Sequence, residues 1–298
     1  MKNIAIILNY NDVETTLKLI NLIQNYNSIN HMVVVDNNSS DNSYDILKKM
    51  ENKKITVLRT SNNGGYAYGN NYGLQYAIEK FSPDYFTICN PDINFTEPTI
   101  REMINFLDIN PKVAAVSPRT YDANGKKDIK TAWKLMSIYL EGLSSLKILG
   151  KIIGDRRYYS EEELSKDFLH VDILPGSFFS IRADLFNTLG LFDDSTFLFG
   201  EERILGYKIK NAGYKSALLG NQSYVHMHGE TIKKSIRKQI SLVRMRQKSK
   251  EYFFKKYLNK NKIELLFLKI FHGLEILELR TYLFIKKSIK SNIFNNRR

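Results

Sequence analysis

The sequence contains one cysteine, Cys89, in 298 residues. A single cysteine excludes an intramolecular disulfide framework and a cysteine-rich metal site, and it is typical of a protein kept in a reducing compartment. Redox chemistry that depends on a pair of thiols is therefore not expected.

Long uncharged apolar runs are also missing. A membrane-spanning helix needs roughly 20 consecutive apolar residues. The most apolar stretch, 263–289, is interrupted by charged side chains at Glu264, Lys269, Glu275, Glu278 and Arg280. The N-terminal run Ile4–Leu8 is too short for a signal-peptide core and lacks a small-residue cleavage site. We expect a chain that does not cross a membrane and carries no visible export signal.

The charge of the chain is uneven. Its formal net charge is +13, and the segment 233–298 is dense in Lys and Arg whereas the first hundred residues are nearly balanced. A basic segment of this kind needs an anionic partner or solvent, and nucleic acid, anionic lipid headgroups and a phosphorylated substrate all qualify. The hydrophobic fraction of 43% is enough to build a sizeable core, with or without an appended region.

Apolar runs and helical patterns alternate through the first 118 residues. The expected strands are Ile4–Leu8, Met32–Val35, Ile55–Leu58, Tyr85–Cys89 and Val113–Val116. The expected helices are 13–26, 43–50, 68–79 and 98–107. This alternation predicts an α/β fold with a mostly parallel central sheet.

The second half of the chain is less regular. Residues 121–168 read as an insertion with helices, which either shapes specificity or is a solvated connector. Order returns at 171–181, where we expect a strand pair around a Pro-Gly turn, followed by helices over 182–189 and 201–212. Beyond residue 228 the pattern is helical, amphipathic and basic.

Polar side chains follow three of the expected strands. Asn9 and Tyr10 follow the first, Asp36 and Asn37 the second, and the segment Asn90-Pro91-Asp92 the fourth. The carboxyl ends of parallel strands form the edge at which open α/β sheets bind ligands. An aromatic ring and an amide or carboxylate oxygen suit a pyrimidine base, although Asn and Asp are also ordinary turn formers.

A loop rich in glycine and asparagine, 62–71, precedes the third helix. Its glycine spacing does not match the dinucleotide fingerprint, and it follows the third strand instead of the first, which argues against a nicotinamide-dependent dehydrogenase. Close packing of the start of the helix against the sheet would explain the glycines, but it explains the asparagines less well.

Two further segments contain side chains that could act in catalysis or bind a metal ion. Glu201 and Glu202 open a helix, where acids can serve as a general base or be favoured by the helix macrodipole alone. His226 and His228 lie two apart, so on an extended strand they face the same side. Two histidines alone are a weak metal signal.

Taken in chain order, these motifs resemble those of the family-2 glycosyltransferases, particularly the bacterial rhamnosyltransferase-like branch. The resemblance covers about 4–229 and implies a GT-A type single nucleotide-binding domain. It implies that the donor contacts Asn9, Tyr10, Asp36, Asn37, Asn62, Gly65, Asn70, Asn71, Asn90 and His226. It also implies a Mg²⁺ or Mn²⁺ ion at Asp92 and His228, and Glu202 as catalytic base with Glu201 as the adjacent alternative. Asn90 and Glu202 stand where the family usually has Asp.

The resemblance further implies an inverting, metal-dependent hexosyltransferase. The donor would be a dTDP- or UDP-sugar, plausibly dTDP-rhamnose or a UDP-hexose. The acceptor would be a polyprenyl-diphosphate-linked saccharide of bacterial capsule, O-antigen or cell-wall polysaccharide. A catalytically silent scaffold would explain the departures at Asn90 and Glu202, and a nucleic-acid-binding protein would explain the charge but not the acids at the strand ends.

The predicted organisation is a catalytic domain over 1–230, with a nucleotide-sugar half at about 1–118 and an acceptor half at about 168–230. A basic helical extension over 231–298 follows. Apolar residues at helical spacing among lysines in 263–289 are typical of a helix on an anionic membrane surface. The same pattern describes a helix packed on the domain or on another subunit. We expect a cytoplasmic protein, peripheral on the inner face of the cell membrane, and do not expect a nucleic-acid partner.

Overall fold

The computed structural model describes residues 1–152, 156–227 and 236–295. The chain divides into two compact units, one formed by 1–135 with 158–229 and the other by 136–157 with 230–298. Residues 136–157 fall inside the range predicted for the catalytic domain but group with the C-terminal segment. Each unit is described below by itself.

The elements of the first unit alternate as the sequence predicts. Its strands are β1 Asn3–Asn9, β2 His31–Asp36, β3 Ile55–Arg59, β4 Tyr85–Cys89, β5 Ile93–Asn94, β6 Val113–Tyr121, β7 Phe168–Val171, β8 Phe178–Arg182 and β9 Lys215–His226. Its helices are α1 Val13–Ile23, α2 Ser43–Lys48, α3 Tyr66–Phe81, α4 Glu97–Ile109, α7 Glu161–Leu164, α8 Ala183–Thr188 and α9 Glu201–Asn211.

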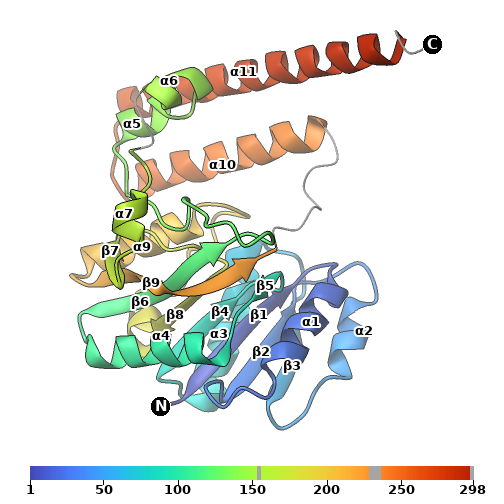
Figure 1. Ribbon diagram of the computed structural model, residues 1–298, viewed down its shortest axis with the longest axis vertical. Coiled ribbons are helices and arrows are strands. Elements are labelled where there is room, and N and C mark those ends of the chain that lie inside the picture. The colour runs from blue at the N-terminus through green and yellow to red at the C-terminus, as the bar shows by residue number, and fades with distance from the viewer. Residues whose placement is uncertain (153–155, 228–235, 296–298) are drawn as a thin grey trace. The chain divides into compact units, whose positions relative to one another are not determined.

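The described strands form one nine-stranded sheet in the order β3-β2-β1-β4-β8-β6-β9-β5, with β7 paired to β9 (Figure 1). The first four strands of this order are parallel. The residues of β1, β2 and β4 are almost entirely buried because helices cover both faces, which is why these strands read as continuous apolar runs. The α/β class with a mostly parallel centre is confirmed.

One expected feature is wrong. The segment 171–181 is not a strand pair closed on itself, because β7 pairs with β9 and β8 pairs antiparallel with β4 and β6. The Pro-Gly segment connects β7, which pairs with β9, to β8, which lies between β4 and β6. It thereby carries Gly176 and Ser177 to the end of β4, where Asn90 donates its N–H to the Ser177 carbonyl at 2.8 Å.

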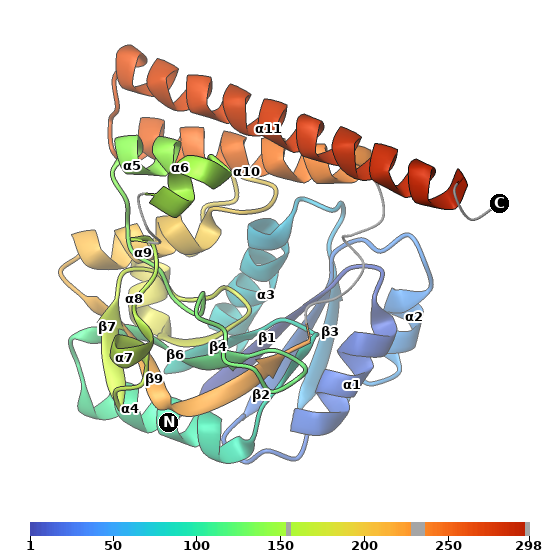
Figure 2. The same cartoon turned by 45° about the horizontal axis from the view of Figure 1, so that its top comes forward.

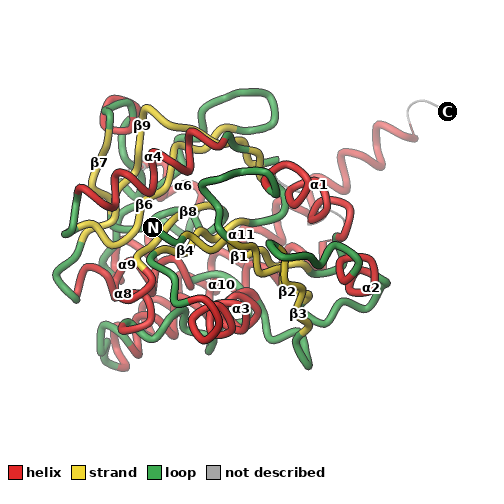
Figure 3. Tube along the Cα trace, turned by 90° about the horizontal axis from the view of Figure 1, so that it is seen from below, coloured by secondary structure: helices red, strands yellow, loops and turns green. Residues whose placement is uncertain are grey.

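Helices cover the sheet on both sides (Figure 3). One face packs against α1, α2 and α4, through side chains such as Ile20, Leu47 and Met103. The other face packs against α3, α8 and α9, through side chains such as Leu74 and Phe186. Two layers of buried apolar side chains therefore fix the strand ends, where the polar residues lie.

The second unit is helical, with α5 Ile138–Leu143, α6 Lys147–Ile152, α10 Ile236–Lys256 and α11 Lys262–Asn295. Helices α5 and α6 lie beside α11 (Figure 2). Helix α5 also meets α10 through an ion pair between Glu141 and Lys250, whose Oε1 and Nζ atoms are 2.6 Å apart and whose side chains are buried. Within the described residues, no helix is both long enough and apolar enough to cross a membrane.

Candidate active site

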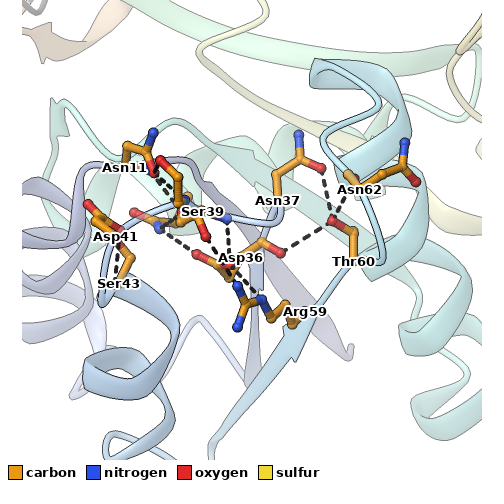
Figure 4. Close-up of polar contacts among 11 residues, drawn as sticks. Asn11, Asp36, Asn37, Ser39, Asp41, Ser43, Arg59, Thr60 and Asn62 are labelled. Carbon is orange, nitrogen blue, oxygen red and sulfur yellow. Dashed lines mark hydrogen bonds and ion pairs between the residues drawn. The ribbon is translucent and has the colours of Figure 1, made fainter.

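The ends of β1 and β2 form a buried polar floor. Asn9 and Asp36 are register partners and both are fully buried. The Asn9 amide donates to Asp36 Oδ2 at 2.9 Å, and the Ser39 N–H donates to Asp36 Oδ1 at 3.0 Å. Thr16 donates its hydroxyl proton to Asn9 Oδ1. Arg59 Nε lies 3.7 Å from Asp36 Oδ1 (Figure 4). These contacts fix both side chains in one orientation.

Asn37 ties this floor to the glycine loop 62–71. Its buried side-chain amide donates to the Gly65 carbonyl and to Asn63 Oδ1, both at 3.0 Å. Its oxygen accepts from the Thr60 hydroxyl at 3.2 Å (Figure 4). Because both ends of the amide are used, Asn37 holds the loop against the end of β2, and its contact with a donor remains a prediction.

The rim above the floor is open to solvent. Tyr10 is 48% exposed directly after β1, and Asn62 is exposed in the glycine loop. Between them Asn11 adopts a left-handed backbone with φ of 51°, a conformation that Asn tolerates. Its side-chain oxygen accepts the N–H of Ser40 at 2.8 Å. Asn11 thus joins the loops after β1 and β2.

The glycine loop is locked to the segment that leads into α9. Gly65 has φ of 97°, and a Cβ there would lie 2.0 Å from the Phe197 carbonyl oxygen, so only glycine fits. The Tyr66 N–H donates to that same carbonyl at 3.0 Å. Asn71 donates to the Phe192 carbonyl at 3.0 Å and accepts the Phe192 N–H at 3.1 Å. These hydrogen bonds hold the two segments together.

Asn70 is also bonded within the protein. It is buried and donates to the Tyr66 carbonyl at 3.0 Å, one turn earlier in α3. Direct contact of Asn70 or Asn71 with a donor stays a prediction, and for Asn71 such contact would require its bonds to Phe192 to open.

A carboxylate and an imidazole meet after β4. Strands β5 and β9 pair so that Ile93 faces His226. This pairing sets His226 Nε2 3.3 Å from Asp92 Oδ1, with both side chains partly exposed. The Met227 N–H donates to the Asp92 carbonyl at 2.8 Å, which fixes the backbone of the two segments together.

This pair fits a divalent cation that is shared with a diphosphate. Carboxylate oxygen and imidazole nitrogen both coordinate Mn²⁺, and Mg²⁺ accepts one or two carboxylates with substrate phosphates completing its shell. The described residues contain no group of three or more His, Cys, Asp or Glu side chains placed to hold a metal. Two protein ligands would therefore need oxygen ligands from substrate and water. His226, predicted as a donor contact, lies beside Asp92, whereas His228 lies outside the described residues.

Glu201 and Glu202 begin α9 after Gly200, which has φ of 98°. Glu201 is 4% exposed, and its Oε2 atom has no hydrogen-bond partner among the residues the structure describes. Burial raises the pKa of the Glu201 carboxyl well above its usual range, and the neighbouring Glu202 charge adds to this. This environment favours the neutral form of the Glu201 carboxyl.

Glu202 faces the Pro-Gly segment. A Cβ built on Gly176 would lie 2.8 Å from Glu202 Oε1, so the carboxyl group rests directly against this glycine. The Gly176 carbonyl accepts the Tyr66 hydroxyl proton at 2.6 Å. Since Ser177 in turn accepts from the Asn90 N–H, a short chain of contacts joins Glu202 to the segment that bears Asp92.

The surroundings of Glu202 are apolar on one side. The small pocket that it lines is otherwise formed mainly by Ala115, Leu174, Phe179, Phe192, Leu205 and Ile209. Burial raises the pKa of Glu202. A helix N-terminus alone would lower a carboxyl pKa, so desolvation outweighs the macrodipole here. A carboxylate with a raised pKa is a stronger base, as general-base chemistry requires.

A buried hydroxyl network supports the imidazole. The Tyr224 hydroxyl lies 2.7 Å from Ser177 Oγ and 2.9 Å from Thr120 Oγ1, and its ring stacks on His226 with centroids 6.4 Å apart. Burial raises the pKa of Tyr224 to about 12. Tyr224 is not among the site residues predicted from the sequence. The available signal was its position two residues before His226, which puts both on one face of a strand.

Solved structures share this fold. A mannosyltransferase from Pyrobaculum calidifontis, in complex with GDP-Man and Mn²⁺, aligns with a TM-score of 0.57 at 16% identity over 96% of this chain and 75% of that chain. GalNAc-T7 with UDP, GalNAc and Mn²⁺ aligns with a TM-score of 0.58 at 15% identity over 91% of this chain and 55% of that chain. The fold is thus that of the GT-A glycosyltransferases, as the motifs imply.

The chain belongs to glycosyl transferase family 2, whose model matches residues 4–190. The hexosyltransferase Agl10 of low-salt glycan biosynthesis in Haloferax volcanii is 24% identical over 69% of this chain and 60% of that protein. The N-acetylglucosaminyl-diphospho-decaprenol L-rhamnosyltransferase of Mycobacterium tuberculosis is 23% identical over 65% of this chain and 66% of that protein. The chain therefore spans less than two thirds of either relative. Membership makes it a glycosyltransferase of GT-A type.

Proposed function

We propose that this glycosyltransferase moves rhamnose or a hexose from a nucleotide-sugar donor to a saccharide acceptor, with inversion at the anomeric carbon. The observation that carries the proposal is the linkage of Glu202, through Gly176 and Ser177, to the segment bearing Asp92. This linkage supports a base on one side of a donor diphosphate site and a metal ligand on the other.

The donor site that we propose lies over the ends of β1 and β2. Tyr10 is exposed there and would stack on the base, above the floor of Asn9 and Asp36. The donor would be a dTDP- or UDP-sugar. Support comes from the rhamnosyltransferase activity named for the Mycobacterium tuberculosis relative and from the UDP bound by GalNAc-T7.

In the proposed reaction Glu202 removes the proton of an acceptor hydroxyl as that oxygen attacks the anomeric carbon. The bond from that carbon to the diphosphate oxygen breaks in the same displacement, so the configuration inverts and no covalent enzyme intermediate forms. A divalent cation bound by Asp92 and His226 would offset the charge on the departing nucleoside diphosphate. Tyr224 orients His226, and Tyr66 holds Gly176 against Glu202.

The acceptor in this proposal is a polyprenyl-diphosphate-linked saccharide used in bacterial surface polysaccharide assembly. The decaprenol-linked acceptor named for the Mycobacterium tuberculosis relative supports it. A cytoplasmic location on the inner face of the membrane, where such acceptors are made, follows as part of the proposal.

A panel of nucleotide sugars tests the donor and the metal together. We expect one dTDP- or UDP-sugar to be turned over with Mn²⁺ or Mg²⁺ and not with a chelator present.

Asp92→Asn should abolish metal-dependent transfer and leave the melting temperature unchanged, because Asp92 is partly exposed. Asp45→Asn, an exposed acid in α2, is the matched control. Unchanged turnover in Asp92→Asn would remove Asp92 from the site, and donor binding without any turnover would favour the silent scaffold.

A further inference from the structure

Helix α11 carries an exposed apolar stripe along one face. Isoleucine, leucine and phenylalanine recur every seven residues at Ile263, Ile270, Leu277 and Phe284, and these side chains are between 54% and 80% exposed. Leu266 and Leu274 widen the stripe and are also exposed. At a rise of 1.5 Å per residue the stripe is about 30 Å long. A row of this length is too regular for the scattered apolar residues that any surface shows.

The unit that contains this stripe holds the excess charge of the protein. Residues 136–157 and 230–298 contain 23 of the 44 Lys and Arg residues but only 7 of the 31 Asp and Glu residues. The rest of the chain therefore has a slight excess of acid. The positive charge of the molecule is a property of this helical unit.

The acids of this unit that the structure describes are all paired or bonded. Glu141 pairs with Lys250, Glu251 with His272, Glu264 with Lys260 and Glu275 with Arg246, and Glu278 accepts the backbone N–H of Lys147. Each of these five carboxylates is partly or fully buried. Basic side chains beside the stripe are instead exposed, among them Lys262, Lys269, Arg280 and Lys286. The exposed surface along the stripe is therefore apolar in its centre and cationic at its edge.

We propose that this stripe and its basic edge dock on an anionic lipid surface, with α11 lying in the plane of the interface. Apolar side chains would enter the boundary between headgroups and acyl chains, and the lysines would contact the headgroups. The proposal concerns attachment only and does not depend on the sugar transferred or on the base.

A second copy of the chain is the alternative occupant, because a seven-residue repeat also describes a coiled coil. The residues at the other core position of such a repeat argue against a coiled coil. If Ile263, Ile270, Leu277 and Phe284 occupied the a positions, the d positions would be Leu266, Gly273 and Arg280. A coiled-coil seam would then enclose a gap at Gly273 and an unpaired charge at Arg280. On a lipid surface Arg280 can extend its guanidinium to the headgroups.

The test is co-sedimentation of the full chain with vesicles, without donor or acceptor present. Vesicles of phosphatidylcholine with 30% phosphatidylglycerol are compared with phosphatidylcholine alone, at about 0.15 M salt. We expect binding to the anionic vesicles and at least tenfold weaker binding to the neutral ones. Ile270→Asn/Leu277→Asn should lower binding to anionic vesicles at least tenfold. Lys269→Gln/Arg280→Gln should lower it severalfold and flatten its salt dependence.

Controls separate the stripe from nonspecific effects. Ile109→Asn removes another exposed apolar side chain, and Lys53→Gln/Lys126→Gln removes two exposed cations elsewhere. Both should bind vesicles as the parent does. Circular dichroism checks that each variant is helical, and light scattering measures its oligomeric state. No vesicle binding by the parent, or equal binding by Ile270→Asn/Leu277→Asn, overturns the proposal. If the parent is a dimer that does not bind vesicles, and Ile270→Asn/Leu277→Asn makes it a monomer, the stripe is instead the contact surface for a second copy of the chain.

Discussion

At the scale of single residues, two adjacent carboxyl groups differ in what they can reach. Glu201 is buried with one oxygen lacking a hydrogen-bond partner among the described residues, whereas Glu202 rests against Gly176 at the edge of an apolar pocket. Burial raises the pKa of both. The Glu202 carboxyl lies against Gly176, and the adjacent Ser177 is bonded to Asn90 in the segment bearing Asp92. This contact supports the proposal that Glu202 is the base.

Glu202→Gln should therefore lower kcat by at least roughly a hundredfold, because an amide cannot accept the acceptor proton. Donor affinity should change little, since Glu202 faces the acceptor side in the proposed reaction. Steady-state kinetics with isothermal titration of the donor measures both quantities. Glu201→Gln is the matched control, and a larger loss of kcat in that variant than in Glu202→Gln would move the base by one residue.

Glu201 should also make stability depend on pH. Its folded-state pKa is raised, so the folded protein binds this proton more tightly than the unfolded chain does. Stability is then lost as pH rises from the usual carboxyl range through the raised pKa. Glu201→Gln cannot ionise, so its melting temperature should exceed that of the parent at pH 8 by more than it does at pH 5. Glu162→Gln, an exposed acid on α7, should show no such difference. A gain for Glu201→Gln that is the same at both pH values would contradict the assignment.

At the scale of elements, the loop that leads into α9 depends on α3. Asn71 bonds both the N–H and the carbonyl of Phe192, and Tyr66 bonds the Phe197 carbonyl. The helix start that presents Glu202 is thereby positioned by the glycine loop. Donor binding at that loop would stiffen the base-bearing segment at the same time.

Asn71→Asp keeps the shape of the side chain but replaces its donor with an oxygen facing the Phe192 carbonyl. Displacing a catalytic group by about 1 Å can cost about a hundredfold in rate. We expect kcat to fall by about tenfold to a hundredfold, with the donor KM changed much less. Gln75→Glu, on the exposed face of the same helix, is the control for added charge. A variant that raises the donor KM and leaves kcat unchanged would instead make Asn71 a donor contact.

The parallel strands and their ends could be predicted because their signal is local. A run such as Met32–Val35 is buried on both faces, and the acid that follows it must lie at the carboxyl edge. Which strands pair with each other across long stretches of sequence leaves no comparable local pattern. The 171–181 segment reads as a hairpin, yet β8 pairs with β4 and β6. The bonds between Asn71 and Phe192 likewise have no local signal, whereas contact of Asn71 with a donor stays a prediction.

At the scale of the whole molecule, the chain builds its helical unit from two separate pieces. Residues 136–157 leave the α/β unit and join 230–298, which no local pattern predicts. The pieces meet in apolar contacts, with Phe267 and Phe271 close to Gly142, and in the buried pair of Glu141 with Lys250. This division also separates the charge, so that the proposed catalytic residues lie in one unit and most of the excess positive charge in the other.

The buried pair gives a test of this division in the full chain. Lys250→Met removes the cation while Glu141, which is 0% exposed, remains buried. Breaking a buried pair in this way costs about 3–5 kcal/mol. Amide hydrogen exchange should therefore speed up in α5, α10 and α11 and stay unchanged in β1 to β4. The double variant Glu141→Leu/Lys250→Met should recover most of the protection, because replacing both partners by apolar groups leaves no unpaired buried charge. Faster exchange in β1 to β4 as well would mean that the two units unfold as one.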